Sequence, residues 1–294
     1  MLGFIESLLN GMLMGSIYGL TAVGLTLIFG VMKVINFAHG SILMVGMYAS
    51  YWCIKLTGMN PYLTLLIVVP FLFCFGYALQ RYVIKPIFDA EKDVREPITV
   101  IIVTTGIWYV LDNLAMILFG AEYRVVQTSV TGKMIEFHEM YFPLAKLIGA
   151  GITLLCGVYL FWFLKHSKTG KAIRATSLDR EAATLMGVNQ SQIYNIAFGL
   201  GAACCGVAAC VLIPFYYVYP TVGVPFDIKA FVIVVLGGLG SIPGAILGGI
   251  IIGIIETVGA QFMAATWTEL LVYGFFLLVL FVKPSGLFGL RQDY

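Results

Sequence analysis

Long apolar stretches fill most of the chain and alternate with short polar segments. A helix that crosses a bilayer needs about 20 mainly apolar residues. Because backbone groups in lipid must find partners within their own segment, such stretches predict helices. We therefore expect an all-α fold, a single polytopic transmembrane helical bundle over residues 1–294. The eight expected membrane segments are about 8–31, 37–57, 61–84, 97–119, 142–164, 191–213, 228–259 and 265–282.

The seventh segment is too long for one straight span. At about 1.5 Å per residue, a helix over 228–259 would be about 48 Å long, whereas the hydrocarbon core is about 30 Å thick. Four glycines and a proline fall within residues 237–244 (GGLGSIPG), which breaks a helix. Lys283 follows the last span, whereas the linker near 260–266 carries no basic residue. We predict a broken or re-entrant hairpin that returns to the outer side, with the C-terminus inside.

Glycines also form rows that suit close helix packing. Gly11, Gly15 and Gly19 recur every four residues, as do Gly249 and Gly253. Small residues at this spacing let two helix backbones approach each other in a membrane. The rows are expected to pack either within this chain or against another subunit.

Composition supports a lipid environment. Hydrophobic residues make up 60% of the chain and charged residues only 11%, whereas soluble domains carry about 25% charged residues. A net charge of +2 gives no indication of a nucleic-acid partner. The first residues contain Glu6 but no basic residue, so they are not expected to be a cleaved signal peptide. No cluster of metal ligands or nucleophiles is visible, so we expect neither a metal site nor an enzyme.

The hydrophilic stretch 165–190 carries five of the 17 lysines and arginines. Basic residues in short loops mark the cytoplasmic side, so this loop is expected inside and the N-terminus outside. A short helix is predicted within it, because Asp179 or Ser177 can cap its start and Gly187 suits the position after its end. Its shared apolar face consists of Leu178, Ala182, Leu185 and Met186.

Such a short helix is marginal in water, so it needs a partner surface. That surface could be a groove on another protein, the chain's own bundle, or lipid headgroups. Glu181, Ala182 and Ala183, followed by Gly187, resemble the EAA loop of ABC-transporter permeases, which docks into the ATP-binding subunit. The Ile-x-Leu-Pro continuation of that loop in other permeases is absent here, where residues 196–199 read IAFG. No P-loop motif is present either, so ATP would have to be bound by a separate chain.

Longer stretches carry a more specific resemblance. Residues 24–48, 201–210, 225–249 and 282–289 are similar in order and spacing to the LivH family, and the resemblance runs from about residue 4 to 290. This family comprises permease subunits of branched-chain amino-acid ABC importers of the bacterial inner membrane. The resemblance implies four kinds of partner: a LivM-like second permease, two ABC ATPase subunits, an extracytoplasmic substrate-binding protein, and membrane lipid. It implies no cofactor on this chain, since ATP is hydrolysed by the partners.

Two regions are candidate parts of a substrate pathway. Asn36, His39 and Ser41 lie at the start of the second segment, where a helix N-terminus attracts anions such as a carboxylate. Alternatively, Asn36 and Ser41 cap that helix and His39 binds a neighbouring carbonyl. The second region is the glycine-rich break, which would expose backbone groups at the depth where transporters bind substrate. Its candidate residues are Gly237, Gly238, Gly240 and Ser241.

Ionisable residues within apolar segments are costly and mark functional positions by default. Here they are Asp112, Glu256, Lys229 and Glu269. Lys229 and Glu269 lie near segment ends and could extend to the interface. Glu256 lies deep and could equally be an anchor between helices.

We interpret the chain as the permease subunit of an ATP-driven importer for leucine, isoleucine or valine. ATPase closure would be transmitted through the helix at 178–187. A related ABC permease for urea, amides or other neutral amino acids is an alternative. An ion-coupled secondary transporter is a further one, although paired deep carboxylates are lacking.

Overall fold

Helices make up most of the computed structural model, which describes residues 2–90, 98–128, 130–137 and 139–288. The helices are α1 (Leu2–Met32), α2 (His39–Thr57), α3 (Leu65–Leu79), a π-helical turn (Gln80–Ile84), α4 (Lys85–Ala90), α5 (Ile98–Phe119), α6 (Leu144–His166), α7 (Lys168–Leu178), α8 (Arg180–Leu185), α9 (Gln190–Leu212), α10 (Gly223–Gly237), α11 (Ile242–Phe262) and α12 (Ala265–Val282). The strands β1 (Met134–Phe137) and β2 (Met140–Pro143) form an antiparallel hairpin.

Seven helices of the described chain are long and apolar enough to cross a membrane. They are Leu2–Met32, Leu65–Ile87, Thr99–Phe119, Leu144–His166, Gln190–Leu212, Ile242–Phe262 and Ala265–Val282. The predicted all-α polytopic fold is therefore confirmed. The segment predicted at 37–57 corresponds to α2, and the one at 228–259 is divided between α10 and α11.

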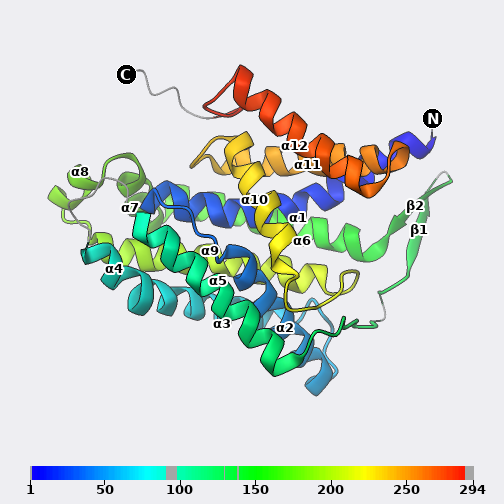
Figure 1. Cartoon of the computed structure of the whole chain (residues 1–294), viewed down its shortest axis with the longest axis horizontal. Coiled ribbons are helices and arrows are strands. Elements are labelled where there is room, and N and C mark those ends of the chain that lie inside the picture. The colour runs from blue at the N-terminus through cyan, green and yellow to red at the C-terminus, as the bar shows by residue number, and fades with distance from the viewer. Residues whose placement is uncertain (1, 91–97, 129, 138, 289–294) are drawn as a thin grey trace.

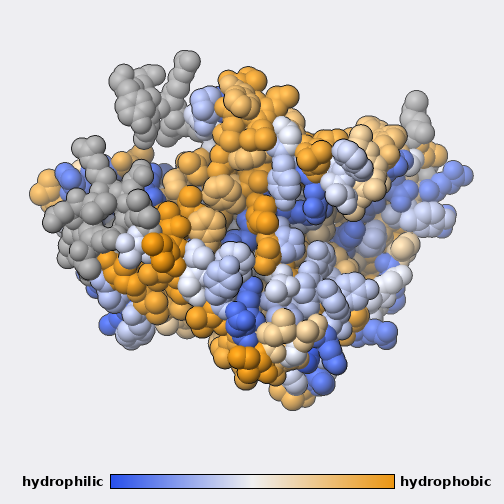
Figure 2. Space-filling view, viewed as in Figure 1, coloured by the Kyte–Doolittle hydropathy of each residue, from blue (hydrophilic) through white to orange (hydrophobic). Residues whose placement is uncertain are grey.

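α1 and α9 form the centre of the bundle, with most of their residues buried against other helices. α5 and α12 lie at the periphery and expose large apolar side chains, including Ile117 and Phe281. Figure 2 shows an apolar surface over α12 and hydrophilic residues around the β1–β2 hairpin. An apolar exterior of this kind is matched by lipid rather than water.

The glycine rows join α1 to α11 within this chain. A Cβ atom added to Gly15 would lie 2.6 Å from the carbonyl oxygen of Gly249, and one added to Gly249 would lie 2.4 Å from the Cα atom of Gly19. These distances leave no room for a side chain, so the two antiparallel backbones touch directly. The rows were expected to pack either within this chain or against another subunit, and the structure shows packing within this chain.

The two ends of the bundle carry different elements (Figure 1). One end, the α8 end, contains Met32, α7, α8 and the turn between α10 and α11. The other end, the β-hairpin end, contains the N-terminus and β1–β2. The residues after α12 return to the α8 end, where Leu287 N donates a hydrogen bond to Leu236 O. The described chain up to residue 288 therefore lies at the same end as the basic loop, whereas the predicted inside location of the C-terminus falls on residues 289–294, outside the described residues.

α10 and α11 form the predicted hairpin, but its turn lies elsewhere than expected. Gly240 lies beside Gly30, near the end of α1, so the turn is at the α8 end and not deep within the bundle. The expectation of a glycine-rich break at the depth of the bundle interior was wrong. The physical reason is that α10 has only 15 residues and starts inside the bundle, so its end already reaches the α8 end.

Candidate functional site

α8 is built as the sequence predicted at both of its ends. The Oδ1 atom of Asp179 accepts hydrogen bonds from the backbone N–H groups of Glu181 (2.9 Å) and Ala182 (3.0 Å). Gly187 has a φ of +83°, which favours glycine, and its N–H donates to Thr184 O. The alternative cap, Ser177, instead donates its hydroxyl to Arg174 O.

A second helix, α7, precedes α8 and was not predicted. Ser167 caps its start by accepting a hydrogen bond from Gly170 N at 2.9 Å. Leu178 is the last residue of α7, so it flanks α8 rather than lying on it, and the predicted helix over 178–187 is shortened to Arg180–Leu185. Gly170, Ile173 and Thr176 are buried on one face of this helix.

The predicted apolar face of this region points away from the bundle. Leu178, Leu185 and Met186 are 80%, 88% and 85% exposed, and Ala182 and Glu181 are also exposed. Ala183 alone among the predicted coupling residues is buried. Within the described chain no hydrophobic neighbour covers these side chains, so a surface that binds them belongs to another molecule.

The other side of α8 is fastened to α1 and α9. The guanidinium group of Arg180 donates a hydrogen bond to Met32 O at the end of α1 and lies over the ring of Tyr194, 5.9 Å from its centroid. The side-chain amide of Gln190 donates to Arg180 O (2.7 Å) and to Thr184 Oγ1 (2.6 Å). Partial desolvation, with a smaller contribution from the charge of Arg180, lowers the pKa of Lys33, which follows α1. α8 is therefore attached to both central helices.

Inside the bundle, the start of α2 is held by carboxylates from two other helices. Asp227 of α10 accepts a hydrogen bond from Gly40 N at 3.2 Å. Asp112 of α5 accepts from Ser41 Oγ at 2.6 Å and from Trp108 Nε1 at 2.8 Å. Negative groups are favourable at a helix N-terminus because of the unpaired N–H groups there.

Asn36 and His39 also find partners within the chain. Asn36 Oδ1 accepts from Ala38 N at 3.1 Å, and His39 Nε2 lies 2.9 Å from Thr21 O and 3.2 Å from Cys205 Sγ. Asn36, His39 and Ser41 are each at most 2% exposed, so no solute reaches them in this conformation. His39 binds a carbonyl group, as the alternative predicted. The predicted capping by Asn36 and Ser41 was wrong: Asn36 accepts from Ala38, which precedes α2, and Ser41 donates its hydroxyl to Asp112, so neither accepts from an N–H group inside the helix. A role in the pathway stays a prediction.

Gly40 and Gly223 bring the starts of α2 and α10 into backbone contact. A Cβ atom on Gly40 would lie 2.3 Å from Gly223 O, and one on Gly223 would lie 2.1 Å from Gly40 O. This contact lies beside Thr21, about three helical turns before α1 ends at Met32. Two helices therefore begin within the bundle, an arrangement that sequence patterns did not reveal because the partners are far apart in the chain.

The glycine-rich candidates form the tight turn at the α8 end. Ser241 caps α11 by accepting from Gly244 N at 3.2 Å, and Gly238 and Gly240 have φ values of +98° and +87°. A Cβ atom on Gly237 would lie 2.4 Å from Gly244 O, so the two arms of the hairpin touch at their base. A pathway role for Gly237, Gly238, Gly240 and Ser241 stays a prediction.

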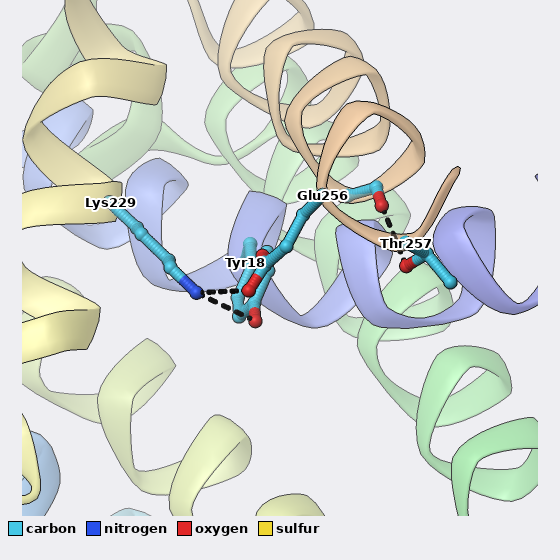
Figure 3. Close-up of polar contacts among 5 residues, drawn as sticks. Tyr18, Lys229, Glu256 and Thr257 are labelled. Atoms are coloured by element: carbon cyan, nitrogen blue, oxygen red, sulfur yellow. Dashed lines mark hydrogen bonds and ion pairs between the residues drawn. The ribbon is translucent and has the colours of Figure 1, made fainter. Parts of the chain in front are cut away.

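Lys229 and Glu256 form an ion pair between α10 and α11, which sequence reasoning treated as two separate residues. Lys229 Nζ lies 2.5 Å from Glu256 Oε1 and 3.2 Å from the hydroxyl oxygen of Tyr18. Figure 3 shows the lysine from α10 and the glutamate from α11 meeting beside Tyr18 of α1. Nearby, Thr257 Oγ1 donates to Gly253 O at 2.8 Å. The interhelical anchor foreseen for Glu256 therefore exists, and its partner is Lys229.

Comparison with known proteins gives matches over nearly the whole chain. Residues 7–281 match the family described as branched-chain amino acid transport system / permease component. The high-affinity branched-chain amino acid transport system permease protein LivH of Escherichia coli (strain K12) is 30% identical over 299 residues, covering 97% of this chain and 96% of the relative. The corresponding protein BraD of Pseudomonas aeruginosa is 29% identical with the same coverage. A probable LivH of Methanocaldococcus jannaschii is 31% identical over 92% of this chain and 88% of its own length. No solved structure matches.

Proposed function

The chain belongs to the permease family of branched-chain amino acid transport systems, and we propose that it is the transmembrane subunit of an ATP-driven importer for leucine, isoleucine or valine. The observation that supports this best is the continuous match from residue 7 to 281 on a multi-pass helical bundle. The match covers both the interior of the bundle and the α8 end. We place the chain in the bacterial inner membrane, with the α8 end facing the cytoplasm.

The proposed importer contains several chains. A permease of an ABC transporter works with separate ATPase subunits and a substrate-binding protein, and we propose a LivM-like permease as the second membrane subunit. The exposed side chains Leu185 and Met186 at the α8 end supply an apolar surface for an ATPase groove. The absence of a P-loop motif in the sequence agrees with ATP hydrolysis on the partner.

α8 is positioned to transmit ATPase motion into the bundle. Arg180 connects it to the end of α1, and Gln190 connects it to the start of α9. α1 and α9 are the most buried spans, so a displacement of α8 reaches the centre of the bundle directly. We propose that this displacement drives alternation between outward-facing and inward-facing states.

Reconstitution tests the proposal. The chain would be co-expressed with a second permease, the ATPases and the binding protein, and uptake of labelled leucine would be measured in proteoliposomes. ATP-dependent uptake that requires the binding protein is the expected result. Uptake that survives ATP depletion but disappears with the ion gradient would support a secondary transporter instead, and uptake of urea or amides alone would reassign the substrate.

A further inference from the structure

The Lys229–Glu256 pair is not needed for the contacts at α8 or at the start of α2. It joins the two arms of the α10–α11 hairpin to Tyr18 of α1 (Figure 3). Lys229 Nζ also lies over the Tyr18 ring, 4.8 Å from its centroid. The second oxygen of the carboxylate, Glu256 Oε2, is buried and has no hydrogen-bond partner among the described residues.

Both side chains of the pair are partly exposed. The side chain of Lys229 is 13% exposed and that of Glu256 is 27% exposed. Charged groups within spans face the bundle interior, a water-filled cavity or a partner subunit rather than lipid. The exposed part of this pair therefore faces an aqueous space or another subunit of the transporter.

We propose that the Lys229–Glu256 pair is a contact site for a zwitterionic amino acid, an inference that rests on the proposed function. When α10 and α11 move during the transport cycle and uncover Oε2, the α-ammonium group of the substrate would bind the Glu256 carboxylate there, and the α-carboxylate would bind Lys229. The pair and the substrate each have zero net charge. Insertion of the substrate therefore exchanges one ion pair for two and adds no net charge to the site.

Aromatic rings form an apolar cluster next to the pair, in which Tyr18 and Phe226 are buried and Tyr216 is half-buried. The Tyr18 and Phe226 rings meet edge to face with centroids 5.9 Å apart, and the Phe226 and Tyr216 rings do so at 5.1 Å. Adjacent charged and apolar surfaces of this kind match an amino acid with a charged backbone end and an apolar side chain. A sugar or urea carries no charged group that could form an ion pair with either residue.

A purely structural anchor makes a different prediction from a substrate site. Breaking a buried ion pair by removing one partner is damaging, but replacing both partners by uncharged groups is often tolerated. An anchor therefore tolerates the double variant Lys229→Met/Glu256→Gln, whereas a substrate site does not. Glu269→Gln on α12 is the matched control, because it makes the same carboxylate-to-amide change at an exposed position.

The test uses the complete importer in proteoliposomes with labelled leucine on a saturating binding protein. For the double variant we expect uptake to fall by about tenfold or more, as when charged hydrogen bonds to the transported molecule are lost. Co-purification with the ATPases and the melting temperature should stay close to those of the unchanged complex. Glu269→Gln should transport normally. If the double variant takes up leucine normally while the single variants Lys229→Met and Glu256→Gln are impaired, the pair is only a structural anchor. That result would overturn the proposal.

Two further measurements separate the remaining outcomes. If the double variant does not assemble, the exchanged variant Lys229→Glu/Glu256→Lys decides. It restores the ion pair but reverses it relative to the aromatic cluster, so we expect low uptake, and uptake equal to the unchanged complex would overturn the site. Uptake by the unchanged complex is measured first. If the unchanged complex does not take up leucine, isoleucine or valine, the proposed function is overturned. If the unchanged complex and the double variant both take up leucine normally, only the proposed contact site is overturned.

Discussion

Arg180 at the start of α8 donates a hydrogen bond to the backbone carbonyl group of Met32 at the end of α1. This contact joins residues that are 148 positions apart and connects the exposed short helix to the most central span. It gives the proposed coupling helix a direct mechanical connection to the bundle.

Removal of that connection should uncouple ATPase motion from transport. A hydrogen bond from a charged group contributes about 1.5–3 kcal/mol, so Arg180→Ala should reduce leucine uptake by about tenfold or more. Membrane insertion should be unchanged, because the bundle itself keeps its packing. Arg174→Ala is the control, since Arg174 donates only a local hydrogen bond to Lys165 O in the described structure. Equal uptake in the two variants would contradict the lever role.

The exposed face near α8 should determine ATPase binding. Leu185 and Met186 are 88% and 85% exposed, so the substitutions Leu185→Glu and Met186→Glu should change the stability of the isolated chain by at most about 0.5 kcal/mol. Both should prevent co-purification of the ATPases, because each places a charge in the docking groove. Ala175→Glu, at an exposed position of α7, should leave co-purification intact. Retention of the ATPases by both α8-region variants would place the docking surface elsewhere.

The contact between α2 and α10 should be highly sensitive to side-chain size. In Gly40→Ala the added carbon would lie 2.3 Å from Gly223 O, and overpacking of this kind costs about 1–3 kcal/mol. Gly106→Ala in α5 is the matched control, because its Cβ atom would meet nothing within 4 Å. Thermal melting in detergent should show a clearly lower melting temperature for Gly40→Ala and an unchanged one for Gly106→Ala. A similar melting temperature for both would mean that the helix starts are separated in the membrane.

Asp227 should stabilise the fold by accepting the hydrogen bond from Gly40 N. Asp227→Ala leaves this N–H group unsatisfied inside the bundle, a change that costs about 1–3 kcal/mol. Asp227→Asn keeps an acceptor oxygen and should retain most of the stability. Melting curves of the three proteins test this order. If Asp227→Ala is as stable as Asp227→Asn, the hydrogen bond from Gly40 N to Asp227 does not stabilise the start of α2.

Local patterns predicted the parts of this molecule that depend on neighbouring residues. The apolar segments, the break in 228–259 and the capping residues Asp179 and Gly187 all follow from short stretches of sequence. The helix α7 was missed because its buried face, at Gly170, Ile173 and Thr176, is mostly small or polar and shows no apolar stripe.

The remaining features depend on contacts between distant residues, which periodicity does not encode. Sequence analysis recognised Lys229 and Glu256 as costly charges, but only the fold brings them together. The same holds for Gly40 and Gly223, whose contact places two helix starts inside the bundle. An apolar period shows that a helix is present but not how deep in the membrane it begins.

The direct backbone contact between α1 and α11 has a kinetic consequence. Each glycine of one helix faces backbone of the other, so a shift by one residue would push a branched side chain such as Ile250 into a space that holds none. Small sliding steps are therefore blocked, and the two helices must travel together as one rod. The joints of the transport cycle then lie where the rod ends, in the segments 33–38 and 238–241, and stiffening these short segments would slow the cycle.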